Sequence, residues 1–385
     1  MSLIRDLMKS IRFWFILVAL GLIPGIAFGA KEEFRGVWVH NWRPGILSES
    51  QVQQTVQWAK DCNMNALVVQ VRRIGDAYYQ SAYEPRANNI EAGPDFDPLG
   101  YVIKRAHPAG LEVYAWFNSY RVGAPTGIPQ LPGHVGLVHP EWLSKDVNGV
   151  TCSADGEFLD PGAPGVREYL VKVAGDIVRK YAIDGLMLDF IRYPGKNWGY
   201  NDSAVAAFNA RYMRKGKPSP DDPLWCDWRR RQVTETVRAI YKEAHNLKPR
   251  IKVSAATIAW GSCPDDFTQS AAYRTVFQDW KSWMRDKLLD ANMPMNYRNP
   301  SLAQKSRAFS DWVCAAKRWS YGRSVYCGLM LYKDVAGTVR QIQLARDKGA
   351  DGVVGLSFSQ DSRQDTLACL LKSGVFTAPA PLLRD

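Results

Sequence analysis

Residues 184–194 read DGLMLDFIRYP, and this stretch decides the fold because a charged residue interrupts an apolar segment in it. Gly185, the residues that follow it up to Leu188, and Ile191 are small or apolar, which is typical of a buried β-strand. Asp189 nevertheless lies inside this apolar run, and Arg192 follows three residues later. Because a buried carboxylate is costly unless a partner or a function offsets the cost, the stretch predicts a strand that ends at a functional acid.

Seven further segments share the short, apolar and β-rich character of this strand, and helix-like segments separate most of them. Eight strands that alternate with helices and are buried on both faces predict a parallel α/β fold, the (β/α)8 TIM barrel. An open doubly wound sheet is the alternative, but no glycine-rich phosphate-binding motif follows the first strand. The predicted strands cover 34–40, 65–72, 111–118, 184–191, 251–260, 291–297, 324–332 and 351–357.

The segments between the strands define the domain organisation. A loop insertion rich in glycine and proline covers 119–163, directly after strand 3, so we expect a single large domain with one long insertion. We assign 1–29 to a signal peptide, 30–376 to the barrel and 377–385 to a flexible tail. Periodic apolar positions predict helices over 50–61, 97–109, 165–181, 203–213, 228–246, 277–289, 302–320, 335–348 and 365–373.

The first 29 residues have the pattern of an export signal. A basic start is followed by an apolar run over 13–23 and by Ala27-Phe28-Gly29, a small-x-small cleavage site. The run is shorter than the ~20 residues of a membrane span, so we expect cleavage near Ala30, with an uncleaved anchor as the alternative. The sequence therefore predicts an exported protein, periplasmic or secreted, with no integral membrane span after cleavage.

The net charge and the cysteine content limit which binding partners, metals and disulfides we expect. The formal net charge is +11, and a basic exported protein is expected to meet an anionic polymer. The one dense basic block, 229–231, is interpreted as a solvated helix face, so no nucleic-acid partner is predicted. The histidines and cysteines show no metal-ligand spacing, so we predict no metal and no cofactor. Among the seven cysteines, a disulfide is expected within the set Cys152, Cys226 and Cys263, and the other four are expected in the core.

The catalytic residues should lie where the barrel strands end, because active sites of this fold occupy the C-terminal face. Asp189 is the best candidate for a catalytic residue. A nearby arginine, Arg192 or Arg72, is expected to lower the pKa of Asp189 and keep it ionised as a nucleophile or base. Asp76 is the leading choice for the acid, ahead of Asp160, Asp265, Asp266 and Asp279; Asp160 is equally well interpreted as a helix cap. The polar and aromatic residues expected to bind substrate are Arg72, Asn118, Arg121, Arg192, Tyr193, Trp260, Asn296, Tyr297 and Tyr332.

Five segments, 34–39, 68–85, 110–121, 159–194 and 293–297, together resemble the bacterial glycosyl hydrolase-like 10 family. The resemblance implies a (β/α)8 barrel, a location in the cell envelope and hydrolysis of glycans; the family includes an enzyme that acts on peptide-free peptidoglycan strands. It places family-typical residues at Arg72, Asp76, Asn118, Arg121, Asp189 and Tyr193. Phe190 stands where many members carry a second acid, and the lipid-attachment cysteine of the enteric member is absent.

The predicted function is that of an exported glycoside hydrolase that cleaves a bacterial polysaccharide with a pair of carboxylates at the barrel mouth. Peptide-free peptidoglycan glycan is the leading substrate. One alternative is another acidic or amino-sugar exopolysaccharide. A second is a catalytically inactive glycan-binding barrel, because the fifth strand carries no glutamate.

Overall fold

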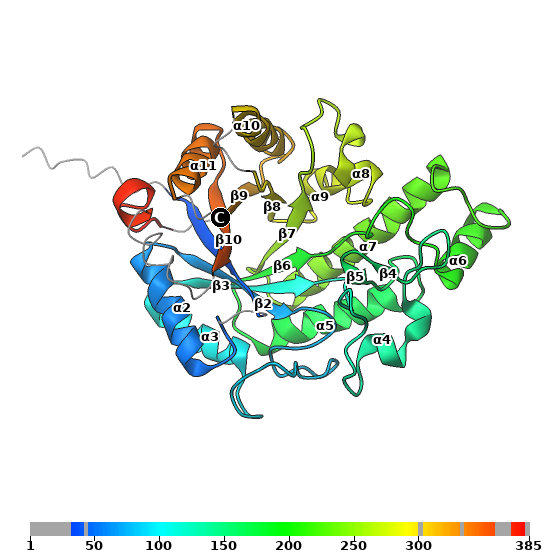
Figure 1. Cartoon of the computed structure of the whole chain (residues 1–385), viewed down its shortest axis with the longest axis horizontal. Helices are drawn as coiled ribbons and strands as arrows, with labels where there is room; N and C mark the ends of the chain where they lie inside the picture. The colour runs from blue at the N-terminus through cyan, green and yellow to red at the C-terminus, as the bar shows by residue number, and fades with distance from the viewer. Residues whose placement is uncertain (1–31, 42–44, 299–302, 332–334, 359–370, 382–385) are drawn as a thin grey trace, which may run out of the picture. The chain divides into compact units, whose positions relative to one another are not determined.

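A closed barrel of eight parallel strands forms the centre of the protein, as the sequence predicts (Figure 1). The computed structural model describes residues 32–41, 45–298, 303–331, 335–358 and 371–381. The predicted signal peptide, most of the predicted helix 365–373, and Tyr332 lie outside these residues. Around the ring the order is β1 (Phe34–Val39), β10 (Gly352–Phe358), β9 (Ser324–Met330), β8 (Ala291–Met295), β7 (Lys252–Ile258), β6 (Gly185–Asp189), β3 (Glu112–Asn118) and β2 (Ala66–Arg72).

Helices connect the strands and cover the outside of the barrel (Figure 1). Helix α3 begins where predicted, because the Asp97 side chain accepts a hydrogen bond from the Gly100 N–H. Helix α7 begins earlier than predicted, since Asp222 caps it before Pro223. Helix α9 is shorter than predicted, since Asp279 caps it. The helices are α2 (Glu49–Asp61), α3 (Pro98–Ala106), α4 (Val135–Val138), α5 (Val166–Lys180), α6 (Asp202–Tyr212), α7 (Pro223–Leu247), α8 (Ala271–Arg274), α9 (Trp280–Arg285), α10 (Ala303–Arg318) and α11 (Val335–Asp347).

The barrel interior is filled by large side chains. Alternation along β3 and β6 directs Tyr114 and Trp116, and Gly185 and Met187, to this interior, where a cluster of buried aromatic and aliphatic residues lies. Gly185 is required, because a Cβ at this position would lie 2.1 Å from the Tyr114 ring. The same alternation places Asp189 at the inner edge of the rim.

The insertion after β3 returns to the ends of the strands. It contains α4, a short 3₁₀ turn (Pro140–Trp142) and a hairpin of β4 (Cys152–Ser153) and β5 (Gly156–Glu157). Backbone bridges join Arg121 to Phe158 and Leu143 to Leu159. These bridges hold the hairpin over the rim of the barrel next to β3.

Three sequence-based expectations are wrong. Cys152, Cys226 and Cys263 are all unpaired, and Cys314, expected in the core, is exposed. The block 229–231 is not uniformly solvated, because Arg229 is buried and donates hydrogen bonds to the carbonyls of Lys196, Trp198 and Pro220.

Within the described part of the chain, every helix is too short or too polar to cross a membrane.

The flexible tail at 377–385 stays a prediction, and its described part, 377–381, makes contacts with the start of the barrel. The Arg35 guanidinium donates to the Ala378 carbonyl at 2.6 Å, and the Glu33 N–H donates to the Pro381 carbonyl at 3.1 Å. Phe376, just before the tail, is buried under the guanidinium groups of Arg35 and Arg346. Backbone carbonyls of this segment therefore make its contacts with the barrel, and Ala380 is its one buried residue within the described range 377–381.

A buried ion pair fixes the end of β2. The Arg72 Nε lies 2.8 and 2.9 Å from the two carboxylate oxygens of Glu84, and both side chains are 0% exposed. The Arg72 Nη1 also donates to the backbone carbonyls of Asn118 and Ser119. The Tyr169 hydroxyl of α5 donates to Glu84 at 2.7 Å. One ion pair thus joins β2, the end of β3 and α5.

Glu84→Gln should destabilise the protein strongly, because it leaves the Arg72 charge buried without a counterion. We expect the free energy of unfolding to fall by about 3–5 kcal/mol, measured by urea denaturation. Glu235→Gln breaks the exposed pair with Arg238 and should change stability by less than about 1 kcal/mol. Equal effects of the two substitutions would contradict a structural role for the buried pair.

Candidate active site

Asp189 lies at the C-terminal end of β6, and both of its carboxylate oxygens accept hydrogen bonds. Its Oδ2 accepts a hydrogen bond from the Trp116 indole Nε1 at 3.0 Å, and its Oδ1 accepts one from the Phe190 N–H at 2.6 Å. Phe190 has a φ of 46°, in the left-handed region that side chains other than glycine rarely adopt. Strained backbone of this kind clusters at functional sites. The turn after β6 is therefore built around the carboxylate.

Burial sets the pKa of Asp189. The side chain is only 7% exposed, and this desolvation raises its pKa above the ordinary value. The Phe190 N–H, the charge of Arg192, the Trp116 N–H and the charge of Arg121 oppose the rise without cancelling it. The expectation of a lowered pKa is therefore wrong. A raised pKa suits a general acid better than a nucleophile or base.

Two arginines lie near Asp189, and a second carboxylate pairs with one of them. The guanidinium carbons of Arg121 and Arg192 each lie 5.1 Å from the centre of the Phe190 ring. Asp155, at the turn of the hairpin, forms an ion pair with Arg192, with 3.0 Å between the Arg192 Nη2 and the Asp155 Oδ2. The backbone carbonyl of Asp155 accepts a hydrogen bond from the Arg121 Nε at 2.6 Å. Both arginines also act electrostatically on Asp189. The two carboxylates therefore share the same pair of cations.

Sequence reasoning missed Asp155. Its side chain is 45% exposed, so the carboxylate can reach a ligand at the mouth. Asp155 belongs to the insertion, whereas the search for catalytic acids followed the strand ends. The only local signal is the turn sequence of 153–156, SADG, which indicates a hairpin but not where the hairpin lies.

An aromatic groove lies beside Asp189, at the ends of β7 and β8. It has a volume of 670 Å³ and is lined in part by Trp260, Tyr297 and Arg298. Trp260 is 44% exposed, and the Arg192 guanidinium lies 5.4 Å from its ring centre. The pKa of Tyr297 is raised well above its ordinary value, first by burial and then by the charge of Asp189. The groove and the acid are therefore neighbouring parts of one site.

Three residues predicted to bind substrate are occupied elsewhere. Arg72 pairs with Glu84 as described above. Tyr193 is buried in the core, with its ring against Phe277 and its hydroxyl 3.5 Å from Asp160. Asn296 is buried, donates to the Phe309 carbonyl and accepts from Arg298. These side chains are consumed by internal contacts, so for them the substrate-binding prediction is wrong.

Asn118 and Asp76 lie deeper in the rim. Asn118, the register partner of Asp189, donates its amide to the Arg73 carbonyl at 2.7 Å. The Asp76 side chain is almost fully buried; it accepts from the Ile74 N–H at 2.9 Å and lies 3.7 Å from the Arg73 guanidinium. These contacts shape the loop after β2. The catalytic role of Asp76 stays a prediction, and its surroundings favour a positioning role.

The other acids considered have structural roles. Asp160 is buried and accepts hydrogen bonds from the Ser144 hydroxyl at 2.8 Å and the Gly162 N–H at 2.9 Å. Asp279 caps α9, and Asp266 accepts from the Thr268 N–H in an exposed turn. For Asp160 the capping interpretation is wrong, because the N-cap of α5 is Gly165 and no side chain caps this helix. The Asp160 oxygens instead organise the turn before α5.

Comparison with known proteins agrees with the geometry. The sequence model of the glycosyl hydrolase-like 10 family matches residues 33–343. The chain is 28% identical over 320 residues to glycosyl hydrolase YngK of Bacillus subtilis, and the match covers 77% of this chain but only 59% of that relative. It is 25% identical over 355 residues to glycosyl hydrolase DigH of Escherichia coli K12, covering 80% of this chain and 76% of DigH.

Solved structures show the same barrel. The glycoside hydrolase domain of PgaB (BpsB) from Bordetella bronchiseptica superposes with a TM-score of 0.63 at 15% identity, over 92% of this chain and 100% of that domain. The catalytic domain of a β-amylase from Paenibacillus polymyxa gives a TM-score of 0.63 at 14% identity, over 92% and 100%. At such identities the likeness establishes the fold.

A carboxyl group at the mouth of a (β/α)8 barrel, beside an aromatic groove, fits the class of glycoside hydrolases, and the family match assigns the chain to that class. The chain belongs to the glycosyl hydrolase-like 10 family. The resemblance seen in the sequence and the predicted enzyme class are thereby confirmed.

Asp189→Asn should change how stability depends on pH. Because the folded-state pKa is raised, ionisation of Asp189 destabilises the wild type as pH rises through that pKa, whereas asparagine has no proton to lose. We expect wild type to lose stability relative to the variant as pH rises from the ordinary pKa of about 3.9 through the raised folded-state pKa. Thermal melts across that range measure the difference.

Asp286→Asn is a control of opposite sign. The Arg285 side chain holds the pKa of Asp286 below its ordinary value, so wild type should gain stability over this variant as pH rises. A gain by wild type over Asp189→Asn in the same direction would show that Asp189 is not a desolvated acid.

Proposed function

We propose that this hydrolase acts outside the cytoplasm on an acidic bacterial polysaccharide, with peptide-free peptidoglycan glycan as its substrate. The observation that carries the proposal is the combination of a desolvated acid, Asp189, with two arginines and an aromatic groove at one mouth. Membership of a glycosyl hydrolase-like family favours cleavage over binding alone. The export-signal pattern of residues 1–29 supports the location.

The charge at the mouth favours an anionic sugar polymer. Arg121 and Arg192 carry planar guanidinium groups, which bind carboxylates through two parallel hydrogen bonds. Peptide-free peptidoglycan has a free carboxylate on each muramic acid unit. The full chain has a net charge of +11, and removal of 1–29 takes away only three basic residues and one acid, so the exported protein stays basic and would attract such a polymer over longer distances. Trp260 and Tyr297 offer ring faces to the C–H faces of the sugars.

The roles of the two carboxylates follow from their environments. Asp189, raised in pKa, protonates the glycosidic oxygen as the leaving sugar departs. Asp155, in its ion pair with Arg192, is the second carboxylate. A water oxygen replaces the leaving oxygen on the anomeric carbon, and Asp155 assists either as the base that takes the proton of this water or as a nucleophile that first bonds to the same carbon. Asp155 replaces Asp76 in this proposal because its carboxylate is half-exposed at the mouth, whereas that of Asp76 is buried in its loop.

Digestion of purified glycan strands tests the substrate. The protein should release soluble fragments from peptide-free peptidoglycan strands, identified by mass spectrometry, and release less from intact peptidoglycan because the peptides block the muramic carboxylates. Asp189→Asn should release none. Efficient cleavage of uncharged chitooligosaccharides, with none of the peptide-free strands, would refute the substrate while leaving the enzyme class intact. Cleavage of another acidic exopolysaccharide alone would favour the second candidate.

Aryl glycosides separate the two carboxylate roles. A nitrophenolate leaving group needs no proton, so Asp189→Asn should retain cleavage of a nitrophenyl glycoside of the substrate sugar while losing glycan cleavage. Asp155→Asn should lose both activities. The reverse pattern would exchange the two roles, and full glycan cleavage by Asp155→Asn would remove Asp155 from the mechanism.

Export is tested by the N-terminus of the mature protein. When the full chain is expressed in a bacterium with an outer membrane, the periplasmic protein should begin near Ala30 by intact-mass spectrometry. Full-length protein retained in the cytoplasmic fraction would contradict export, and full-length protein in the membrane fraction would indicate an uncleaved anchor.

A further inference from the structure

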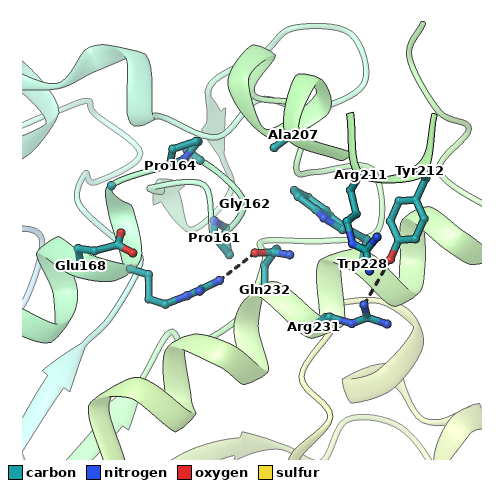
Figure 2. A pocket seen from close by; sticks show the side chains of 13 residues that line it. Pro161, Gly162, Pro164, Glu168, Ala207, Arg211, Tyr212, Trp228, Arg231 and Gln232 are labelled. Atoms are coloured by element: carbon teal, nitrogen blue, oxygen red, sulfur yellow. Dashed lines mark hydrogen bonds between the residues drawn. The ribbon is translucent and has the colours of Figure 1, made fainter. Parts of the chain in front are cut away.

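A second pocket lies away from the aromatic groove, between α5, α6 and α7 (Figure 2). It has a volume of 500 Å³ and shares no lining residue with the groove at β7 and β8. Figure 2 shows Arg211 and Tyr212 of α6 on one side and Glu168 of α5 on the other, with Trp228 and Gln232 of α7 between them. The proposed catalytic residues take no part in it.

The pocket has an excess of positive charge. Arg167, Arg211 and Arg231 line it together with a single carboxylate, Glu168. Among the described residues none of these three arginines forms an ion pair. Their contacts are to neutral groups: Arg167 donates to the Gln232 side-chain oxygen at 2.9 Å, and Arg231 to the Tyr212 hydroxyl at 3.4 Å. The Arg167 Nε is buried and has no hydrogen-bond partner in this part of the chain.

The floor of the pocket is rigid and aromatic. Trp228 is buried and stacks on Trp225, with ring centres 4.9 Å apart and planes 12° apart. Gly162 approaches Trp228 so closely that a Cβ there would lie 2.2 Å from the indole. Trp228 is thereby fixed between the turn before α5 and its neighbour on α7. A fixed ring among unpaired guanidinium groups suits a sugar that carries a carboxylate.

We propose that this pocket is a second binding site for an acidic sugar unit, which holds the polymer away from the bond that is cleaved. The polymer bound here is the same acidic glycan that the proposed function names as substrate, so the choice of ligand rests on the proposed function. In a parallel barrel the helices begin at the end where the strands finish. The pocket lies at the first turn of α5, beside the second and third turns of α7, so it opens at the same end of the barrel as Asp189. Long strands can occupy both sites, and short fragments only one.

The double variant Arg211→Gln/Arg231→Gln tests the pocket, since both side chains are exposed and their loss should not impair folding. Binding is measured by calorimetry in the Asp189→Asn background, so that the polymer is not cleaved. We expect affinity for long peptide-free glycan strands to fall by about tenfold or more. Affinity for neutral chitooligosaccharides should be unchanged. In the active enzyme, KM for long strands should rise while kcat and the cleavage of short fragments stay the same.

The matched control is Arg179→Gln/Arg238→Gln, which removes two charges from exposed positions of α5 and α7 outside the pocket. The control should bind as the parent does. Equal weakening in both double variants would show a general charge effect and overturn the inference, as would unchanged binding by the pocket variant. If the strands are cleaved but the pocket variant binds normally, only the inference fails. If nothing is cleaved and the pocket variant still loses binding, only the proposed function fails.

Discussion

The buried ion pair of Arg72 and Glu84 is the interaction on which the geometry of the site depends. It holds the carbonyls of Asn118 and Ser119 at the end of β3, and the Ser119 N–H donates in turn to the Asp189 carbonyl at 2.7 Å. The backbone that carries the acid is therefore tied to a charge pair on the neighbouring strand. Because breaking a buried pair leaves an uncompensated charge, this tie strongly resists deformation.

The same rigidity explains how Asp189 can remain desolvated. Trp116 and Phe190 donate hydrogen bonds to its carboxylate oxygens. The guanidinium groups of Arg121 and Arg192 lie next to the Phe190 ring and do not form direct ion pairs with Asp189. Arg192 is engaged by Asp155 instead. Burial therefore outweighs the two positive charges in setting the pKa. The Phe190 ring lies next to both guanidinium groups, and the carboxylate that pairs with Arg192 comes from the insertion.

The barrel could be predicted because its signals are local. Each strand is a short apolar run, and each helix shows its own periodicity. Position at a strand end also sufficed to find Asp189, Arg121, Arg192, Trp260 and Tyr297, which the structure brings together. It failed for Arg72, Tyr193 and Asn296, because sequence does not show which polar side chains are consumed by internal partners. Asp155 was missed since the position of its hairpin depends on contacts between distant segments, and the direction of the Asp189 pKa shift depends on burial.

The central claim is that desolvation raises the pKa of Asp189 above its ordinary value, as suits a general acid. Carbon-13 NMR of protein with labelled aspartate carboxyl groups measures it directly, with Asp189→Asn identifying the resonance. The account predicts a titration midpoint above the ordinary aspartate value of 3.8. A midpoint at or below 3.8 would contradict it and would return Asp189 to the role of an ionised nucleophile or base.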